Sequence, residues 1–192
     1  MNKEKTLCKP NPFTCIKTGP KSDTYTYSER KGIDSVAFII RTGEDEYLLT
    51  SERKPPMDAR INEEISGIYY NSKDEAFIAT AFGGSNDKID VEDYVKMNNL
   101  EKFEYFKETV MNEAIEEAGY LIQKSDVYFV GAAFVSSQSN QMCYLYMVDG
   151  VDALVEERRP DSEMEAQAKN FYFSKNEIKA FSIDWKANFI VR

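Results

Sequence analysis

The stretch "KETVMNEAIEEAG", from Lys107 to Gly119, holds four glutamates with small and apolar residues between them. Its periodicity predicts the end of a long helix that runs from about Leu100 to Ala118. Gly119 is a natural stop for this helix, because glycine readily adopts the left-handed conformation that follows a helix end. The function of the chain depends on whether these carboxylates form an ordinary solvated face or hold a metal ion.

One face of the predicted helix is apolar. At about 100° per residue, Glu117 falls within this stripe and Glu113 lies at its edge, with Glu116 slightly further round. Glu108 lies away from the other three glutamates and fits a surface position. The stripe itself, which we expect to pack on a sheet, consists of Phe103, Phe106, Val110 and Ala114.

A carboxylate on a packing face is costly unless something compensates for its charge. Neither Glu113 nor Glu117 has a lysine three or four residues away with which to form a surface ion pair. A divalent cation would supply the missing charge. From these residues alone, a metal site and simple surface acidity are about equally supported.

Composition narrows the function classes. The 192 residues suit one domain, or one domain with a small appendage. A net charge of −9 argues against a nucleic-acid binder, which needs a basic surface. Because the chain contains no histidine, any metal must sit on oxygen ligands, which favours Mg²⁺ or Mn²⁺.

The sequence gives no sign of a membrane segment or a metal-binding cysteine set. No apolar run approaches the roughly 18 residues needed to span a bilayer, and the first residues lack the apolar core of a secretory signal. We therefore expect a cytoplasmic protein without a membrane partner. Cys8, Cys15 and Cys143 lack zinc spacing and are expected to be reduced, incidental thiols.

Most of the other predicted elements are strands, and residues 60–76 and the charged segment after Val155 are expected to be irregular. A short helix is indicated over Val91–Met97, and a terminal helix follows Ser174, with Glu177 at the capping-box position. The predicted strands are Ser35–Arg41, Tyr47–Arg53, Ala76–Phe82 (which ends at Gly83 and Gly84), Val127–Val135, Met142–Val148 and "KNFYF".

The glutamate spacing resembles the Nudix box, in which Arg-Glu, an apolar residue, any residue, Glu-Glu, any residue and Gly follow one another. "NEAIEEAGY" places Glu113, Glu116, Glu117 and Gly119 in register, and counting back gives Glu104 as the first glutamate of the box. The chain thus looks like a Nudix hydrolase. This resemblance implies an α/β/α sandwich with a mixed sheet and a central loop-helix-loop motif.

Two positions depart from the box. Asn112 stands where the family has an arginine that pairs with acidic side chains and orients the catalytic carboxylates, so we expect asparagine to weaken activity. The box glycine is not five residues before Glu104. If Gly83 fills that role, about fifteen extra residues precede Glu104, which indicates an insertion near residues 85–99.

The similarity extends from about residue 33 to the end and is greatest to the branch of ADP-ribose and ADP-sugar pyrophosphatases. Residues 33–192 are therefore expected to form the Nudix domain, with residues 1–32 as an arm or short strands. In this branch, protomers pair through such arms, so the tyrosine-rich residues 24–30 are compatible with a homodimer. The proline that marks the ADP-ribose subgroup is replaced by Ser136 and Ser137.

The resemblance also implies roles for individual residues. Glu113, Glu116 and Glu117 would hold one to three Mg²⁺ or Mn²⁺ ions, with the backbone carbonyl of Phe82 as an extra ligand. The general base of this branch comes from the late acidic segment, where Glu165 is the first candidate and Glu163 the reserve. Surface charge is the alternative for each glutamate. Further candidates for substrate contact are Arg53, Gly83 and Gly84, and for base stacking Tyr69, Tyr70, Phe134 and Tyr144.

The expected function is hydrolysis of a nucleoside diphosphate linked to a second group, with ADP-ribose or a related nucleotide sugar as the first guess. The products would be a nucleoside monophosphate and a phosphorylated second group. Because Asn112 replaces the arginine of the box, an alternative hypothesis is a module that binds nucleotides without catalysing their hydrolysis. Other Nudix substrates, such as dinucleoside polyphosphates or NADH, and a purely structural acidic protein also stay open.

Overall fold

A mixed β-sheet forms the centre of the structure, a computed structural model that describes residues 5–6, 15–18, 26–29, 34–54, 68–72, 75–86, 88–137, 139–181 and 184–192. Its strand order is β10-β11-β4-β5-β7-β6, with β13 paired to β5 and β8 paired to β4. β11 and β4 run parallel, and the other pairs are antiparallel. The strands are β4 (Ser35–Gly43), β5 (Glu46–Lys54), β6 (Ile68–Ser72), β7 (Glu75–Thr80), β8 (Phe82–Ser85), β10 (Val127–Phe134), β11 (Met142–Asp149) and β13 (Asn170–Phe173).

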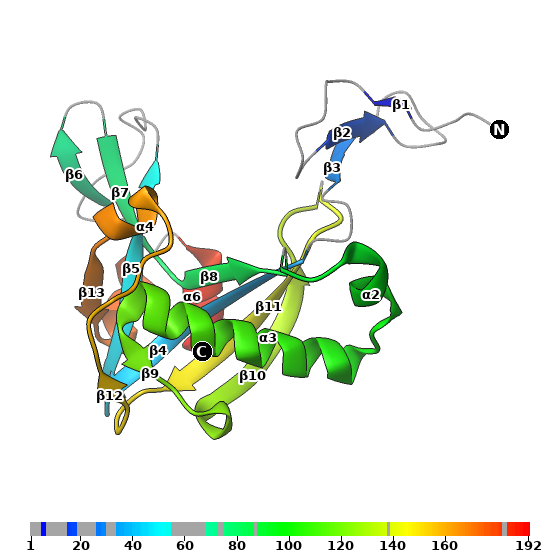
Figure 1. Cartoon of the computed structure of the whole chain (residues 1–192). Coiled ribbons are helices and arrows are strands. Elements are labelled where there is room, and N and C mark those ends of the chain that lie inside the picture. The colour runs from blue at the N-terminus through cyan, green and yellow to red at the C-terminus, as the bar shows by residue number, and fades with distance from the viewer. Residues whose placement is uncertain are drawn as a thin grey trace.

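Helices cover both faces of this sheet (Figure 1). The long helix α3 (Asn99–Glu113), continued by a π-helical turn over Ala114–Ala118, packs on one face. The helices α5 (Lys175–Phe181) and α6 (Trp185–Ile190) cover the other. This α/β/α sandwich with a mixed sheet is the fold class that the Nudix resemblance implied.

The side chains of the central strand β4 explain why helices cover both faces of the sheet. Val36, Phe38 and Ile40 pack in the cluster beneath α3, whereas Ala37 and Ile39 pack beneath α5 and α6. A strand buried on both faces has to be apolar at consecutive positions, and "SVAFII" meets that requirement.

The long helix begins and ends as its sequence indicates. The Asn98 side chain accepts hydrogen bonds from the N–H groups of Leu100 (2.9 Å) and Glu101 (3.1 Å), and Glu101 Oε2 accepts from the Asn98 N–H (2.7 Å). At the other end Gly119 adopts φ 78°, the left-handed conformation that glycine tolerates. Of the predicted stripe, Phe106, Val110 and Ala114 are fully buried and Phe103 is partly buried against the same core.

The segment from 68 to 85 differs from its prediction. Residues 68–72 belong to a strand, β6, instead of an irregular stretch, and residues 60–67 lie outside the described part. The predicted strand Ala76–Phe82 is two strands, because the chain leaves its partner β5 after Thr80 and pairs with β4 from Phe82. Asp184 Oδ2 accepts a hydrogen bond from the Ala81 N–H (2.9 Å) at this change of partner. Both glycines consequently lie within β8.

Short elements escaped prediction because each has few residues to show a period. The late charged segment contains α4 (Glu163–Gln167), which the Ser162 side chain caps by accepting from the Glu165 N–H. β9 (Tyr120–Leu121) pairs with β12 (Leu154–Val155). The insertion contains α2 (Val91–Lys96), close to its predicted position.

The described residues before 30 form a separate three-stranded sheet of β1 (Lys5–Thr6), β2 (Cys15–Thr18) and β3 (Thr26–Glu29), which stands apart from the main sheet in Figure 1. A single bridge between Ser28 and Ser139 links β3 to the loop after β10. The role of this arm in a homodimer stays a prediction.

Two further sequence-based expectations concern membrane segments and cysteines. Within the described residues, no helix has the length and apolar character needed to cross a membrane. Cys143 is a buried free thiol, whereas Cys8 lies outside the described residues.

Candidate functional site

The last two turns of the long helix lie tightly against β8. The carboxylate of Glu117 accepts a hydrogen bond from the backbone N–H of Gly83. A methyl group placed on Gly84 would lie 2.7 Å from Glu113 Oε1 and 2.9 Å from its Cγ, closer than real methyl contacts come, and 3.0 Å from its Cδ. Gly84 therefore allows the Glu113 side chain to approach the strand, whereas a methyl group on Gly83 would meet only an ordinary contact.

Gly84→Ala is expected to displace Glu113 and weaken Mn²⁺ binding by about tenfold, because a methyl group would occupy the space of its side chain. Calorimetric titration with Mn²⁺ measures this effect. Gly83→Ala is the matched comparison, since its added methyl group would meet only Val36 O at an ordinary 3.5 Å. Equal Mn²⁺ affinity in the Gly84 variant and the wild type would contradict the geometry.

Burial and mutual repulsion raise the pKa of two carboxyl groups in this cluster. Burial, followed by the charge of Glu116, raises the pKa of Glu113 to about 7, and Lys88 opposes the shift. Burial, followed by the charge of Glu113, raises the pKa of Glu117 to about 8, and Arg158 opposes it. Near neutral pH, these carboxylates therefore lack enough neighbouring positive charge to compensate their own negative charge.

Two buried oxygens in the cluster have no hydrogen-bond partner: Glu116 Oε2 and Glu117 Oε2. Buried polar atoms are ordinarily satisfied, and hard oxygen donors with excess negative charge suit Mg²⁺ or Mn²⁺. Among the described residues, no three Cys, Asp or Glu side chains already converge as a metal shell. The donor set fits a divalent cation, and its binding would require the carboxylates to turn toward one another.

Glu117→Gln is expected to stabilise the metal-free protein at alkaline pH. The ordinary pKa of the carboxyl group, 4.5, is raised to about 8 in the folded protein, so between these values the folded state holds a proton that the unfolded state has lost. The stability from this site is therefore full below pH 4.5 and is lost as the pH rises through 8.

A glutamine at position 117 does not titrate, so the stability of the variant does not depend on pH through this site. With a chelator present, the melting temperature of Glu117→Gln should exceed that of the wild type by about 5 °C at pH 9 and by much less at pH 5. Glu108→Gln is the control, because Glu108 is exposed on the same helix and pairs with Lys124. A gain independent of pH would show that charge burial is not the cause.

The late acidic segment brings another carboxylate to the cluster. The charge of Glu165, on α4, raises the pKa of both Glu113 and Glu117, so the three groups share one environment. Its carboxylate accepts a hydrogen bond from the Asp161 N–H (3.2 Å), and burial raises its own pKa. Glu163, the reserve base, is exposed at the start of α4.

Residues 156–170 are bound directly to the end of the helix. The Arg159 N–H donates to the Glu116 carbonyl (3.0 Å), and Asn170 Nδ2 donates to the Glu117 carbonyl (3.0 Å). The Glu156 N–H donates to the carbonyl of Gly119 (2.7 Å), where a methyl group would collide with the Glu156 carbonyl. The backbone at the two glutamates is thereby fixed to the segment that carries Glu165.

Arg158 is a functional candidate that sequence reasoning missed. Its Nη1 donates to the Ala168 carbonyl (2.9 Å) and its Nη2 to the Glu165 carbonyl (2.7 Å), while its Nε is buried without a partner. Its charge acts on Glu117. Nothing in "VEERRPDSE" distinguishes this arginine from its neighbours, because the contacts join residues that only the fold brings together.

Of the other expected residues, Glu104 does not join the cluster. Glu104, which the family pairs with the box arginine, binds Lys124 (3.0 Å) and Lys107 (3.6 Å) instead, and Asn112 is exposed. The side chains of Arg53, Tyr69 and Tyr70 lie outside the described residues, so their roles stay predictions, as does that of the Phe82 carbonyl. Of the other aromatics, Tyr144 is buried against Phe106, and Phe134 is 62% exposed.

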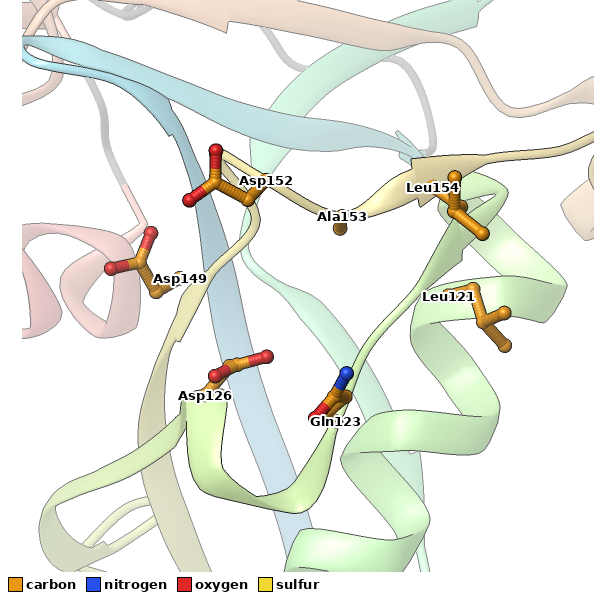
Figure 2. A pocket seen from close by; sticks show the side chains of 7 residues that line it. All are labelled: Leu121, Gln123, Asp126, Asp149, Asp152, Ala153 and Leu154. Atoms are coloured by element: carbon orange, nitrogen blue, oxygen red, sulfur yellow. The ribbon is translucent and has the colours of Figure 1, made fainter.

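Two surface pockets were compared with the position of the carboxylate cluster. One of about 190 Å³ lies beside the cluster and is lined by Lys88, Tyr105, Glu108, Thr109, Asn112 and Glu113. A second, of about 370 Å³, contains none of the expected site residues. Figure 2 shows the carboxylates of Asp126, Asp149 and Asp152 around it, and Asp149 is already paired with Arg41.

The chain was compared with known protein families, sequences and structures. No family model and no curated protein sequence matches the chain. It does resemble a solved structure described as an ADP compounds hydrolase, with 11% sequence identity and a TM-score of 0.53. The match covers 92% of this chain and 80% of the other. At this identity the likeness shows the fold alone, and that fold agrees with the sandwich that the Nudix resemblance implied.

Proposed function

We propose that this chain is a Mg²⁺- or Mn²⁺-dependent hydrolase of the pyrophosphate bond in a nucleoside diphosphate linked to a second group. ADP-ribose and related nucleotide sugars are the first candidates for its substrate. The observation that carries the proposal is the cluster of Glu113, Glu116 and Glu117, with two buried carboxylate oxygens that have no partner. The likeness in fold to an ADP compounds hydrolase supports the same reaction class.

The three helix glutamates would hold the metal, and the carbonyl of Phe82 in β8 would be a further oxygen ligand. Bound there, a divalent cation supplies positive charge to the phosphate oxygens, where negative charge grows during hydrolysis. The tight contact between Gly84 and Glu113 keeps the carboxylates beside the strand.

Glu165 is proposed to take the proton from the attacking water. Its carboxylate lies in the electrostatic environment of Glu113 and Glu117, and burial raises its pKa above the ordinary range of a glutamate. A higher pKa makes the group a better proton acceptor at neutral pH. The carboxylate is held by the Asp161 N–H, and the helix that carries it by the Ser162 cap.

One set of observations favours a second function, a nucleotide-binding module without turnover. Asn112 is exposed and Glu104 is paired with lysines, so neither acts on the cluster as the family arginine and its partner would. Such a module would keep the fold and the binding of nucleotides but lack the hydrolytic step.

A substrate panel separates the two functions. The purified protein is incubated with ADP-ribose, ADP-glucose, NADH and dinucleoside polyphosphates, with Mg²⁺ or Mn²⁺, and the products are identified by chromatography. Release of AMP and ribose 5-phosphate from ADP-ribose is the expected result. Nucleotide-induced thermal stabilisation without any product would support the silent module and contradict the hydrolase.

A further inference from the structure

We infer that Arg158 is a positioning residue: its guanidinium group ties the helix that carries Glu165 to the chain beside the carboxylate cluster. The inference rests on the proposed function, because it assigns a role to Arg158 within the same site. It names the residue that supplies order and positive charge where Asn112 does not.

The first step of the argument is the bridge to α4. A guanidinium group has several donors in a planar fork, and two of those of Arg158 bind the carbonyls of Glu165 (2.7 Å) and Ala168 (2.9 Å). These carbonyls lie at the C-terminal end of the short helix, where the Glu165 carbonyl also accepts a hydrogen bond from the Ala168 N–H (3.0 Å). The bridge therefore fixes the end of α4 relative to residue 158.

The second step connects residue 158 to the long helix. The next residue, Arg159, donates its N–H to the Glu116 carbonyl (3.0 Å), so the chain that carries Arg158 is attached to the glutamate turn. Glu165 is thus joined to Glu116 through one backbone hydrogen bond and one guanidinium bridge. A short, continuous set of contacts determines how the candidate base faces the candidate metal ligands.

The far end of the segment has separate anchors. The Lys169 N–H donates to Ser51 Oγ (2.8 Å), and Asn170 Nδ2 donates to the Glu117 carbonyl (3.0 Å). These contacts do not involve the guanidinium group. Loss of Arg158 should accordingly loosen α4 while leaving residues 169–173 in the sheet.

The third step compares Arg158 with the arginine that follows it. The Nε of Arg158 is buried without a hydrogen-bond partner, and its other two guanidinium nitrogens bind the C-terminal end of α4. Arg159 differs, since its side chain is 65% exposed and its guanidinium group binds Glu156 (2.6 Å). Two adjacent arginines therefore divide into one that faces the site and one at the surface, which supplies a matched control.

Three variants test the inference: Arg158→Ala, Arg158→Lys and the control Arg159→Ala. Lysine keeps the charge but cannot bind two carbonyls through a planar fork. Both Arg158 variants should lower kcat by about tenfold or more with KM changed less than about twofold, because the base is misplaced while the substrate still binds. Arg159→Ala should match the wild type.

Two further readouts distinguish positioning from general damage. Hydrogen exchange of the amides over residues 163–168 should accelerate in both Arg158 variants and not in Arg159→Ala. Mn²⁺ affinity measured by calorimetry should be unchanged or higher in Arg158→Ala, because a neighbouring positive charge has been removed. Damage to the whole site would instead lower that affinity.

Unchanged exchange over 163–168, equal loss of kcat in Arg159→Ala, or full activity in Arg158→Lys would overturn the inference. If the wild type hydrolyses no substrate, the proposed hydrolase function fails on its own. The exchange measurement still decides whether Arg158 holds α4, so the two failures are distinguishable.

Discussion

Glu117→Gln is expected to lower kcat by roughly 10²–10³-fold. Losses of this size follow the removal of one group that stabilises the charge of a transition state. Glu117 lies in the buried stripe of the long helix, and its Oε2 is a buried oxygen without a partner. Glutamine preserves the size of the side chain and removes the charge that a divalent cation needs. Steady-state kinetics with saturating Mg²⁺ measures the effect.

Glu108→Gln is the control for this variant. It makes the same chemical change on the same helix, but Glu108 is exposed and bound to Lys124 (3.3 Å), away from the cluster. Its kcat should stay within about twofold of the wild type, since exposed ion pairs contribute little. Comparable losses in the two variants would show that net charge, and not the cluster, governs turnover.

Glu165→Gln is expected to lower kcat by about 10²–10⁴-fold, the range for loss of a general base. Burial raises the pKa of Glu165, and its charge acts on both Glu113 and Glu117. The dependence of kcat on pH should also lose its acidic limb, because glutamine has no proton to lose. Mn²⁺ affinity should change little, which separates this variant from Glu117→Gln.

Glu163→Gln tests the choice between the two carboxylates of α4. Glu163 is exposed at the first position of the helix, two residues from Glu165. Its replacement should leave kcat and the pH profile close to those of the wild type. A large loss in this variant, with activity retained in Glu165→Gln, would reverse the assignment of the base.

The glutamate helix could be predicted because its signal is local and periodic, whereas the layered fold was predicted from the resemblance to the Nudix box. The stripe of Phe106, Val110 and Ala114 specified the packed face, and the turn at Gly119 specified the end of the helix. The same periodicity placed Glu113 and Glu117 on the buried side. Each of these inferences depends only on residues within a few turns of one helix.

What the sequence did not reveal depends on contacts between distant segments. The exchange of strand partners at Ala81 is fixed by Asp184, about a hundred residues away in the chain. Gly84 resembled an ordinary turn glycine, although its role is to admit the Glu113 side chain. Arg158 and Asn170 carried no spacing signal, because their acceptors belong to other elements.

Calorimetric titration of the metal-free protein with Mn²⁺ at pH 7.5 tests the central claim most directly. Performed in two buffers with different ionisation enthalpies, it also counts the protons released. Metal ligands must be deprotonated, and the pKa values of Glu113 and Glu117 are raised to about 7 and about 8. We expect saturable binding with proton release that persists in Glu108→Gln and is lost in Glu117→Gln. Absence of binding in the wild type, or equal binding in both variants, would contradict a metal site at the end of the helix.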